Sequence, residues 1–398
     1  MLLRNRASVL PLSLPARSAN QSVRETVDLP TPSLAIDARW LVGGIGTYIQ
    51  ALLEGLSAEP GGHPVRVITR ARHLHSVRPL HSSVVVVDAP IYGIREQLSL
   101  PPALRGVRLL HVPHFNIPLT YRGKLIVTIH DVILTTVSPY ANTAASFCYA
   151  RPMLWLAARR ADHIITVSEF SKQQIVDRLH VSPHKISVIP NGVRPCFRHH
   201  HPLKARRVVS QLLRFDSPYL LFVGNFKPHK NLHRLLQSLA ILRSQGKHCD
   251  QKLLLVSEDA TENDAVRAQI QALGLAAAVI SAPCLSNDEL ALAYSGADAL
   301  LMPSTSEGFG LPVAEAMACG TPVLCSHIPP FLEVAGDAAS YFDPYNPAGL
   351  AATIDDFLTH PEQHAAFRAK GLDRASQFNT STFVRRHLDI YKEFSDLS

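Results

Sequence analysis

Residues 299–320 read ALLMPSTSEGFGLPVAEAMACG. The first four residues form a short apolar run that is typical of a buried strand, and Gly308 and Gly310 then flank an aromatic residue in a tight loop. Pro312 suits the first turn of a helix and Gly320 suits its end. A strand, a glycine loop and a helix start, in that order, are how α/β proteins hold phosphate. The stretch therefore predicts an α/β fold and a phosphorylated, hydroxyl-rich ligand.

Two carboxylates, Glu307 and Glu315, bracket this loop. We expect Glu307 in the loop and Glu315 one turn into the helix, where each could accept hydrogen bonds from the paired hydroxyls of a ribose or hexose. The amides of Gly310 and Leu311, at the open helix start, could hold a diphosphate. The plainer interpretation is that Glu315 neutralises the helix start and Glu307 is solvated.

Short apolar strands alternate with helices from residue 31 to the end of the chain. In the first half we predict strands at 34–37, 65–69, 84–87, 109–112, 125–129, 164–167 and 186–189. In the second half we predict them at 219–223, 253–256, near 279, and at 299–302, 322–325 and 341–342. Such alternation gives parallel sheets covered on both faces. We therefore expect two Rossmann-like domains facing a central cleft, with the loops at the strand ends directed into it.

The 398 residues are too many for one core and suit two domains. Residues 1–30 are interpreted as a disordered lead, and 31–200 as the first domain. The segment 201–217, which continues a stretch rich in His, Arg and Pro, is predicted to be a linker. The second domain is expected at 218–382, followed by a helix in 383–398.

The charge balance is basic, with a formal net charge of +7. This favours anionic ligands, nucleotides or an anionic membrane face, although an inert basic surface is equally consistent with it. There is no basic stripe interleaved with aromatic residues, so nucleic acid is not an expected partner.

None of the six cysteines forms a C-x-x-C pair or stands at zinc-ligand spacing, which indicates a reducing, cytoplasmic compartment and no metal site. The adjacent histidines 199–201 could not easily converge on one ion, so a solvated connector is favoured there. No apolar run approaches 18 residues, and Val9–Leu14 is too short for a signal peptide.

Several motifs together resemble the retaining glycosyltransferases of the GT-B fold, particularly the bacterial group called family four, or glycosyltransferase group 1. Residues 307–322 resemble the E-x7-E signature of that family. Further matches lie at Gly43–Gly46, at the TVSEFS of 166–171, at the VIPNGV of 188–193, and at 222–224 with 230–232. The resemblance covers about residues 33–395. It implies that the C-terminal helix returns to the first domain.

The resemblance assigns roles to the loop residues. Glu307 would contact hydroxyls of the donor sugar, Glu315 would hold the nucleotide ribose, and Lys230 would neutralise the departing diphosphate. A solvated lysine is the alternative for Lys230. The backbone amides expected to contact phosphate and sugar are those of Gly308, Phe309, Gly310 and Leu311.

In the first domain, the resemblance places His130 beside the donor sugar, where a neutral imidazole could also donate to developing charge. A His-Asp pair that only caps the strand end is the alternative. Gly44 and Gly46 belong to a loop that approaches phosphate or acceptor, and Asp37 could orient that loop.

The chain departs from the family beside the predicted lysine. Many relatives have an arginine where this chain has Asn225 or His229. Both residues are expected near the donor phosphates, and Lys227 is close enough to compensate for the missing arginine.

The resemblance implies metal-independent transfer of a sugar with retention, and no cofactor. Residues 36–39, 44–48 and 130–131 look like those of bacterial polysaccharide mannosyltransferases, which favours GDP-mannose as donor, with UDP-glucose next. The acceptor would be a saccharide or a lipid-linked saccharide. Three arginines, Arg151, Arg159 and Arg160, flank apolar residues 153–156 of a helix that could touch an anionic inner membrane face; an ordinary amphipathic helix is the alternative.

Two other functions stay open at this point. A nucleotide-sugar 2-epimerase on the same fold would need no acceptor. A degenerate, non-catalytic sugar-nucleotide-binding protein is favoured by the missing arginine, whereas the joint presence of His130, Lys230, Glu307 and Glu315 argues against it.

Overall fold

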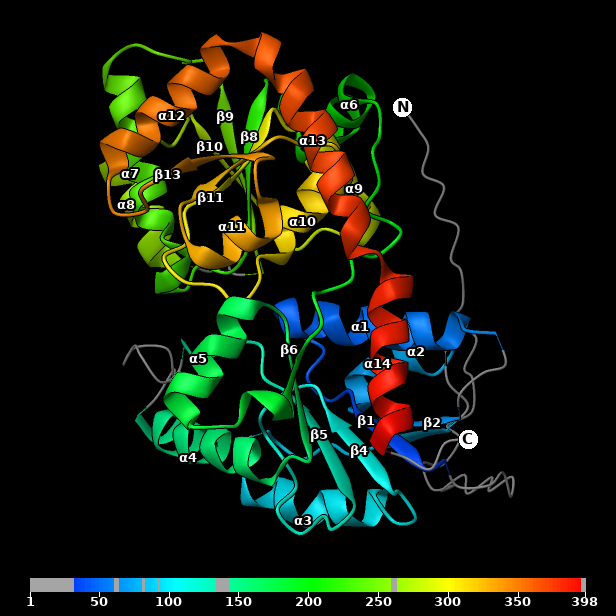
Figure 1. The fold of residues 1–398 in the computed structure, drawn as a ribbon. Coiled ribbons are helices and arrows are strands. Elements are labelled where there is room, and N and C mark those ends of the chain that lie inside the picture. The colour runs from blue at the N-terminus through cyan, green and yellow to red at the C-terminus, as the bar shows by residue number, and fades with distance from the viewer. Residues whose placement is uncertain are drawn as a thin grey trace, which may run out of the picture. The chain divides into compact units, whose positions relative to one another are not determined.

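The computed structural model describes residues 32–60, 64–80, 83–91, 93–133, 144–258 and 263–394, without the side chains of 144–148. The predicted lead, residues 1–30, lies outside this part of the chain. One compact unit begins at Pro32 and contains all the described residues (Figure 1).

The first sheet has seven parallel strands in the order β3-β2-β1-β4-β5-β6-β7. Its strands are β1 (Leu34–Asp37), β2 (Val65–Thr69), β3 (Ser83–Val86), β4 (Leu109–Val112), β5 (Lys124–Thr128), β6 (His163–Thr166) and β7 (Ile186–Val188). The helices of this half are α1 (Gly43–Ala58), α2 (Leu74–Val77), α3 (Ile94–Ala103), α4 (Ala144–Arg160) and α5 (Glu169–Leu179). We call this sheet and its helices the N-terminal lobe.

The second sheet has six parallel strands in the order β10-β9-β8-β11-β12-β13. They are β8 (Tyr219–Val223), β9 (Lys252–Val256), β10 (Val279–Ala282), β11 (Ala299–Met302), β12 (Val323–Ser326) and β13 (Ala339–Phe342). The helices are α6 (Pro202–Leu213), α7 (Leu232–Ser244), α8 (Asp264–Ala272), α9 (Asn287–Gly296), α10 (Leu311–Ala318), α11 (Pro329–Ala335), α12 (Pro347–Thr359) and α13 (His364–Ala375). This sheet and these helices form the C-terminal lobe, and α14 (Thr380–Phe394) follows them.

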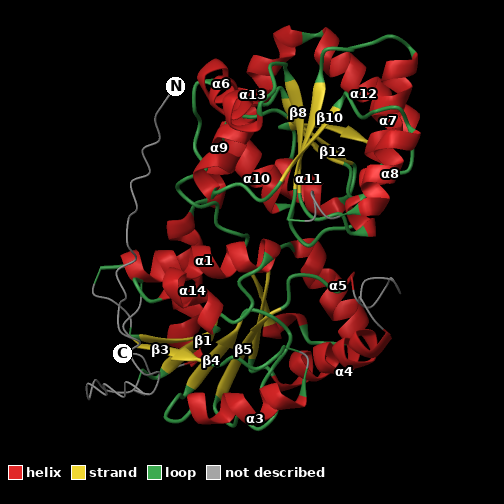
Figure 2. Cartoon of the chain, turned by 180° about the vertical axis from the view of Figure 1, so that it is seen from behind, coloured by secondary structure: helices red, strands yellow, loops and turns green. Residues whose placement is uncertain are grey.

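Helices cover both faces of each sheet (Figure 2). Successive strand residues belong to opposite apolar layers, as alternation of side chains along a strand requires. In β8, for example, Leu221 packs in one layer while Leu220 and Phe222 pack in the other. The prediction of two parallel α/β sheets covered on both faces is confirmed.

Each sheet has one place where the strand order reverses. It lies between β1 and β4 in the first sheet, and between β8 and β11 in the second. Loops that leave two such strands diverge to opposite faces and open a crevice at the carboxyl ends, which is where ligands bind in open α/β sheets. The fold therefore offers two places at which a ligand site is to be looked for.

The chain runs between the lobes twice, and the two connecting segments are bonded to each other. Val193 forms an isolated parallel bridge with Asn379, and its amide donates to Phe378 O at 2.7 Å. Thr380 Oγ1 donates to Val193 O at 2.8 Å. Beyond this joint, α14 packs against α1, so the C-terminal helix completes the wall of the N-terminal lobe (Figure 1).

A buried chain of hydrogen bonds holds α14 in place. The carbonyl of Phe383 determines which atoms in this chain donate and which accept. His387 Nδ1 lies 2.7 Å from Phe383 O, so Nδ1 must carry the proton because a carbonyl only accepts. His387 Nε2 then accepts from the Tyr48 hydroxyl at 2.6 Å. With its proton so used, the Tyr48 oxygen accepts from Thr128 Oγ1 at 2.9 Å.

The chain continues into the sheet with the same direction. Thr128 accepts from His111 Nε2 at 2.8 Å, and His111 Nδ1 accepts from the Tyr391 hydroxyl at 2.6 Å. Both imidazoles are neutral in this arrangement. Burial agrees with it, because it lowers the pKa of His387 to about 4 and the pKa of His111 well below its ordinary value.

Two expectations about boundaries are wrong. The Gly43–Gly46 stretch is the first turn of α1 and not a loop, since Gly43, with a φ of +59°, already starts the helix. The predicted linker 201–217 contains α6, which packs on α9 through its buried face and donates from Arg206 Nε to Gly296 O at 2.9 Å.

We predict that Tyr48→Phe lowers the free energy of unfolding by about 1–3 kcal/mol, because His387 Nε2 and the Thr128 hydroxyl would lose their partner in a dry site. Urea denaturation measures the difference. Tyr345→Phe, at a residue that is 64% exposed, is the control and should leave the midpoint unchanged. Equal stability of the Tyr48 variant and the parent would contradict the directed chain.

Candidate active site

The strand-order reversal of the second sheet holds an ion pair. Lys230 follows β8 and Glu307 follows β11, and their side chains meet with Nζ 2.7 Å from Oε1. Ser304 Oγ donates to the same Oε1 at 2.7 Å. Within the described residues nothing donates to Oε2 of Glu307. The carboxylate is therefore oriented through one oxygen and offers the other to a ligand hydroxyl.

The loop after β8 is shaped to deliver Lys230 to this place. Gly224 has a φ of +148°, and a Cβ built there would lie 3.7 Å from Lys230 Cε, in ordinary van der Waals contact with that side chain. Asn231, with a φ of +59°, turns the chain into α7. Its buried Nδ2 donates to Pro303 O at 2.8 Å and to Pro344 O at 2.7 Å, which ties together the loops after β8, β11 and β13. This structural role of Asn231 is not evident from the sequence.

Asn225 and His229, the two positions where the resemblance leads us to expect an arginine, contribute differently. Burial lowers the pKa of His229 to about 4, against the opposing charge of Glu307, so its ring is neutral beside the ion pair. Its carbonyl accepts from Thr305 N at 2.8 Å and joins the two loops. Asn225 Oδ1 accepts from Lys227 N at 3.3 Å, so this side chain stabilises its own turn. Lys227 is exposed at the rim.

In the loop before α10, the surroundings of Gly308 and Gly310 leave no room for a side chain. A Cβ on Gly308 would lie 2.3 Å from His130 O. Gly310 has a φ of +103°, and a Cβ there would lie 2.6 Å from Phe331 Cε1. The ring of Phe309 is buried, which leaves its backbone as the part that can contact a ligand.

The start of α10 is open, as expected. The helix begins at Leu311, with Pro312 in its first turn and no side chain capping it. Among the described residues, no acceptor bonds the amides of Gly310 and Leu311. These amides and the helix dipole offer a site for an anion. The helix ends as predicted, with Gly320 at a φ of +71° just beyond it.

The second carboxylate has a different environment. Glu315 lies within α10, buried, and Oε2 accepts from the Tyr294 hydroxyl at 2.9 Å. Burial raises the pKa of Glu315 to about 8, although Tyr294 and Arg194 oppose the rise. For Glu307, burial acts to raise the pKa. The charge of Lys230 and the hydrogen bonds from Lys230 and Ser304 have a larger, opposite effect, so the pKa of Glu307 lies below its ordinary value. At neutral pH Glu307 is thus ionised and Glu315 protonated.

His130 comes from the N-terminal lobe, directly after β5. Its Nε2 lies 3.1 Å from Pro113 O, so Nε2 carries the proton and Nδ1 is an acceptor. Burial lowers the pKa of His130 to about 4. In this arrangement the one N–H of His130 is bonded to Pro113 O, so Nδ1 is the atom open to a ligand, and the contact of His130 with the donor sugar stays a prediction.

Serines of α5 bind the glycine loop of the other lobe. Ser168 Oγ donates to Gly308 O at 2.6 Å and accepts from Ser171 N at 3.0 Å, so Ser168 also caps the start of α5. Ser171 Oγ lies 3.1 Å from His130 O and 3.2 Å from Gly308 O. From α11, Glu333 accepts from the amide of Glu169 at 2.8 Å. Glu333 is a second positioning residue that the sequence did not single out.

The glycines of α1 are not equivalent. Space is open around Gly44, whose assignment to the donor remains a prediction. Gly46 donates its amide to Val42 O at 3.1 Å, and a Cβ there would lie 2.5 Å from Leu41 C, so its part is to permit the first turn. Asp37 does not orient this turn; its side chain binds Arg39 instead.

Two further observations concern metal binding and membrane contact. Among the described residues, no three His, Cys, Asp or Glu side chains are grouped as metal ligands. Within those same ranges, no helix is both long and apolar enough to cross a bilayer. The apolar residues of α4 expected at a membrane face are largely internal, because Met153 and Leu154 are buried and only Trp155 is well exposed.

Comparison with known proteins gives matches over both lobes. A model described as glycosyl transferases group 1 matches residues 207–374, and one described as Glycosyltransferase Family 4 matches residues 42–196. The chain is 26% identical to O-antigen chain mannosyltransferase B of Escherichia coli, over 73% of this chain and 76% of the relative. It is 30% identical to O-antigen chain mannosyltransferase RfbU of Salmonella typhimurium, over 65% of this chain and 67% of the relative. The structure of Anabaena HepE in complex with UDP-glucose matches with a TM-score of 0.74 and 19% identity, over 90% of this chain and 99% of that chain.

We predict that Glu315→Gln flattens the pH dependence of stability between pH 5 and pH 9. A carboxyl whose pKa rises on folding contributes stability below its unfolded pKa and loses it as pH rises through the folded value, here about 8. Each unit of that difference is worth about 1.4 kcal/mol. The free energy of unfolding of the variant, relative to that of the parent, should therefore be higher at pH 9 than at pH 5. Chemical denaturation at both pH values measures it.

Glu307→Gln is the matched control, because the pKa of Glu307 is shifted downward. The difference in stability between that variant and the parent should stay constant from pH 5 to pH 9. A constant difference for Glu315→Gln as well would show that Glu315 is ionised in the folded protein.

Proposed function

Because this chain belongs to the glycosyl transferases of group 1, we propose that it transfers a hexose, mannose in the first place, from a nucleotide diphosphate sugar to a saccharide or lipid-linked saccharide. Its two parallel sheets are those of the GT-B fold. The observation that carries the proposal is the Lys230–Glu307 pair at the strand-order reversal, beside the open start of α10.

The donor diphosphate would lie between Lys230 and the start of α10. Lysine has three N–H donors, and Glu307 takes one of them, so the others remain for phosphate oxygens. The amides of Gly310 and Leu311 add neutral donors and the helix dipole. This arrangement supports a donor site that stabilises negative charge without an arginine.

The two glutamates would bind different hydroxyls. Glu307 Oε2 is the free oxygen of an ionised carboxylate and suits a hydroxyl of the donor sugar. Glu315 suits the ribose, where two hydroxyls would favour its ionised form and nucleotide binding would release a proton. His130 Nδ1 would accept from a further sugar hydroxyl.

We propose transfer with retention, by attack on the same face from which the nucleotide leaves. The bond between the anomeric carbon and the phosphate oxygen breaks, and a bond to the acceptor oxygen forms. The acceptor proton passes to an oxygen of the leaving phosphate. Lys230 and the helix start neutralise the charge that develops on that phosphate, as a preorganised positive site should. The reaction so drawn requires no metal ion.

The donor is proposed from the relatives. The two bacterial proteins compared above are named mannosyltransferases, which supports GDP-mannose. UDP-glucose is the second candidate, because the structurally similar HepE was determined with it. We place the reaction in the cytoplasm. Arg151, Trp155 and Arg159 of α4 are the exposed side chains through which the protein could touch an anionic membrane.

We predict that GDP-mannose raises the melting temperature of the protein more than UDP-, dTDP- or ADP-sugars do, because a ligand stabilises the folded state by RT ln(1 + [L]/Kd). Transfer to saccharide acceptors is then followed by mass spectrometry, with the anomeric configuration read by NMR. Transfer should survive EDTA.

The outcomes separate the alternatives. If no nucleotide sugar raises the melting temperature, the proposed function is contradicted. Binding without transfer indicates a non-catalytic binding protein, and release of an epimer without acceptor indicates an epimerase. An inverted product would overturn retention.

We predict that Lys230→Ala lowers kcat by about 100-fold or more, which is the range for removing one charge-stabilising donor from an enzyme site. Lys227→Ala is the matched control, an exposed lysine of the same loop, and should change kcat little. Thermal denaturation of both variants checks that the fold persists, since Lys230→Ala leaves Glu307 buried without its partner. Parent-like turnover in a folded Lys230 variant would contradict the role in the diphosphate site.

A further inference from the structure

The strand-order reversal of the first sheet holds a second polar site, which the donor does not use in the proposal above. Asp37 ends β1 and Arg39 and Trp40 follow it, while the loop after β4 carries His114 and Asn116. These residues line a small cavity of about 10 Å³. That volume is enough for one water-sized group.

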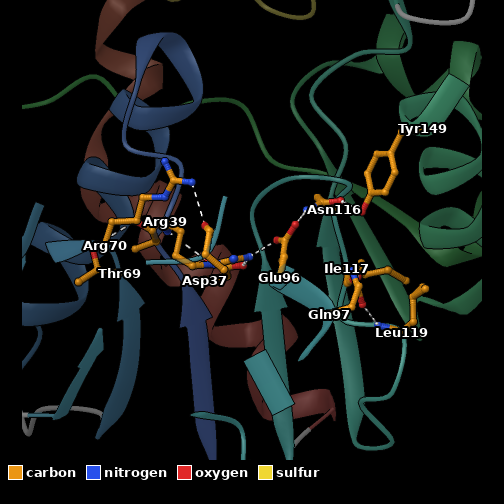
Figure 3. Close-up of polar contacts among 12 residues, drawn as sticks. Asp37, Arg39, Thr69, Arg70, Glu96, Gln97, Asn116, Ile117, Leu119 and Tyr149 are labelled. Atoms are coloured by element: carbon orange, nitrogen blue, oxygen red, sulfur yellow. Dashed lines mark hydrogen bonds and ion pairs between the residues drawn. The ribbon is translucent and has the colours of Figure 1, made fainter. Parts of the chain in front are cut away.

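Arg39 has hydrogen-bonding capacity that the protein leaves unused. Its side chain is only 2% exposed. Nε donates to Asp37 Oδ1 at 2.8 Å, while Nη2 donates to Asp37 Oδ2 at 2.6 Å and to Glu96 Oε1 at 2.5 Å (Figure 3). These bonds use three of the five N–H groups of arginine. Nη1, with the remaining two, is buried and has no hydrogen-bond partner among the described residues.

The guanidinium cannot reorient to satisfy Nη1, because its carboxylate partners are themselves held. Asn116 Nδ2 donates to Glu96 Oε2, and Tyr149 donates to Asn116 Oδ1 at 2.9 Å (Figure 3). Nη1 is thus a fixed donor on a residue that lines the cavity. A ligand oxygen that reached it would make a bond that water does not compete for freely.

The charge around Arg39 selects the kind of ligand. One guanidinium faces two carboxylates, Asp37 and Glu96, at ion-pair distance. Arg70 lies near enough to interact electrostatically with both Arg39 and Glu96, so two cations balance the two carboxylates. A phosphate or a carboxylate entering here would find no excess positive charge to offset the loss of its hydration. A hydroxyl group brings an acceptor oxygen without a charge, and it also matches the size of the cavity.

The rim of the cavity suits the carbon face of a sugar ring. Trp40 and His114 stack with their ring centroids 5.0 Å apart and their planes at 11°. Trp40 is partly exposed. Flat aromatic surface beside a hydroxyl-sized polar cavity is the combination that a pyranose needs, since its C–H face is apolar and its edge is polar.

The cavity is also next to the reaction centre. Pro113 accepts the hydrogen bond of His130 Nε2, and His114, the next residue, lines the cavity. A sugar seated on Trp40 would therefore lie on the acceptor side of the donor sugar that His130 contacts.

We propose that this cavity is the subsite for a neutral hexose of the acceptor, with one hydroxyl bonded to Arg39 Nη1 and the ring stacked on Trp40. The inference rests on the proposed function and adds the part of the acceptor that is recognised and the residues that recognise it. The acceptor terminus, on this basis, is an uncharged sugar and not a phosphorylated or acidic one.

The chain offers a reporter, because Trp40 and Trp155 are its only two tryptophans. In Trp155→Phe protein, fluorescence reports on Trp40 alone. Methyl glycosides of mannose, glucose, galactose and N-acetylglucosamine are titrated, and at least one should give a saturable change. Mannose 6-phosphate should bind no more tightly than methyl mannoside. Arg39→Lys in the same background should weaken glycoside binding about tenfold or more. Lysine keeps the positive charge but lacks the second terminal nitrogen that would donate to the ligand.

Glu307→Gln in this background is the control for binding at the donor site, and it should leave the Trp40 signal unchanged. Silence across the glycosides, tighter binding of the phosphorylated sugar, or unchanged affinity in Arg39→Lys would each overturn the inference. If Arg39→Lys does not fold, Trp40→Ala in the parent decides. It should raise the acceptor KM and leave the nucleotide-sugar KM unchanged, and equal acceptor KM values contradict the subsite.

The test of the function is separate. Nucleotide sugars are followed by melting temperature and transfer, and neither measurement depends on Trp40 fluorescence. If the protein binds nucleotide sugars and transfers sugar, but the fluorescence of Trp40 does not change with any glycoside, only the subsite is refuted. If no nucleotide sugar changes the melting temperature, the proposed function is refuted.

Discussion

The carbonyl oxygen of Gly308 is the point on which the two halves of the site depend. It accepts hydrogen bonds from Ser168 and Ser171 of the N-terminal lobe, and the absence of a side chain at Gly308 lets the backbone of His130 approach. Glu307 is the preceding residue, so the contact that joins the lobes also sets the distance between the histidine of one lobe and the ion pair of the other. Glu333, which binds the first turn of α5, supports the same joint from α11.

Around that joint, identical side chains acquire different chemistry from their surroundings. Glu307 is paired with Lys230 and keeps its charge, while Glu315 is buried beside a neutral tyrosine and holds a proton. Both remain positioning groups in the proposed reaction, since the departing phosphate accepts the acceptor's proton. In the proposed donor site, Lys230 would link the sugar and phosphate sides, because its partner Glu307 is the residue proposed to bind the sugar.

Family resemblance singled out Lys230, whereas local pattern was enough to predict the strands and the start and end of α10. These features depend on residues close together in sequence or on the rule that parallel strands present their carboxyl ends at one edge. The sequence did not reveal the roles of Asn231 and Glu333, or the Arg39 network, because each depends on partners far along the chain. The tautomer of His130 was missed for the same reason, since a carbonyl on a neighbouring strand end decides it. Helix α6 was mistaken for a linker because its His- and Arg-rich start hides a narrow apolar stripe.

The return of α14 to the first lobe has a consequence for how this molecule could be divided or recombined. The N-terminal lobe is discontinuous in sequence: its wall includes residues that the chain supplies only after the whole C-terminal lobe. A fragment cut at the first crossing would expose the face of α1 and leave Tyr48 and His111 without their distant partners. An exchange of lobes between relatives would have to carry the last helix with the first half, because the C-terminal lobe stands in the sequence as an insertion between two parts of the N-terminal lobe.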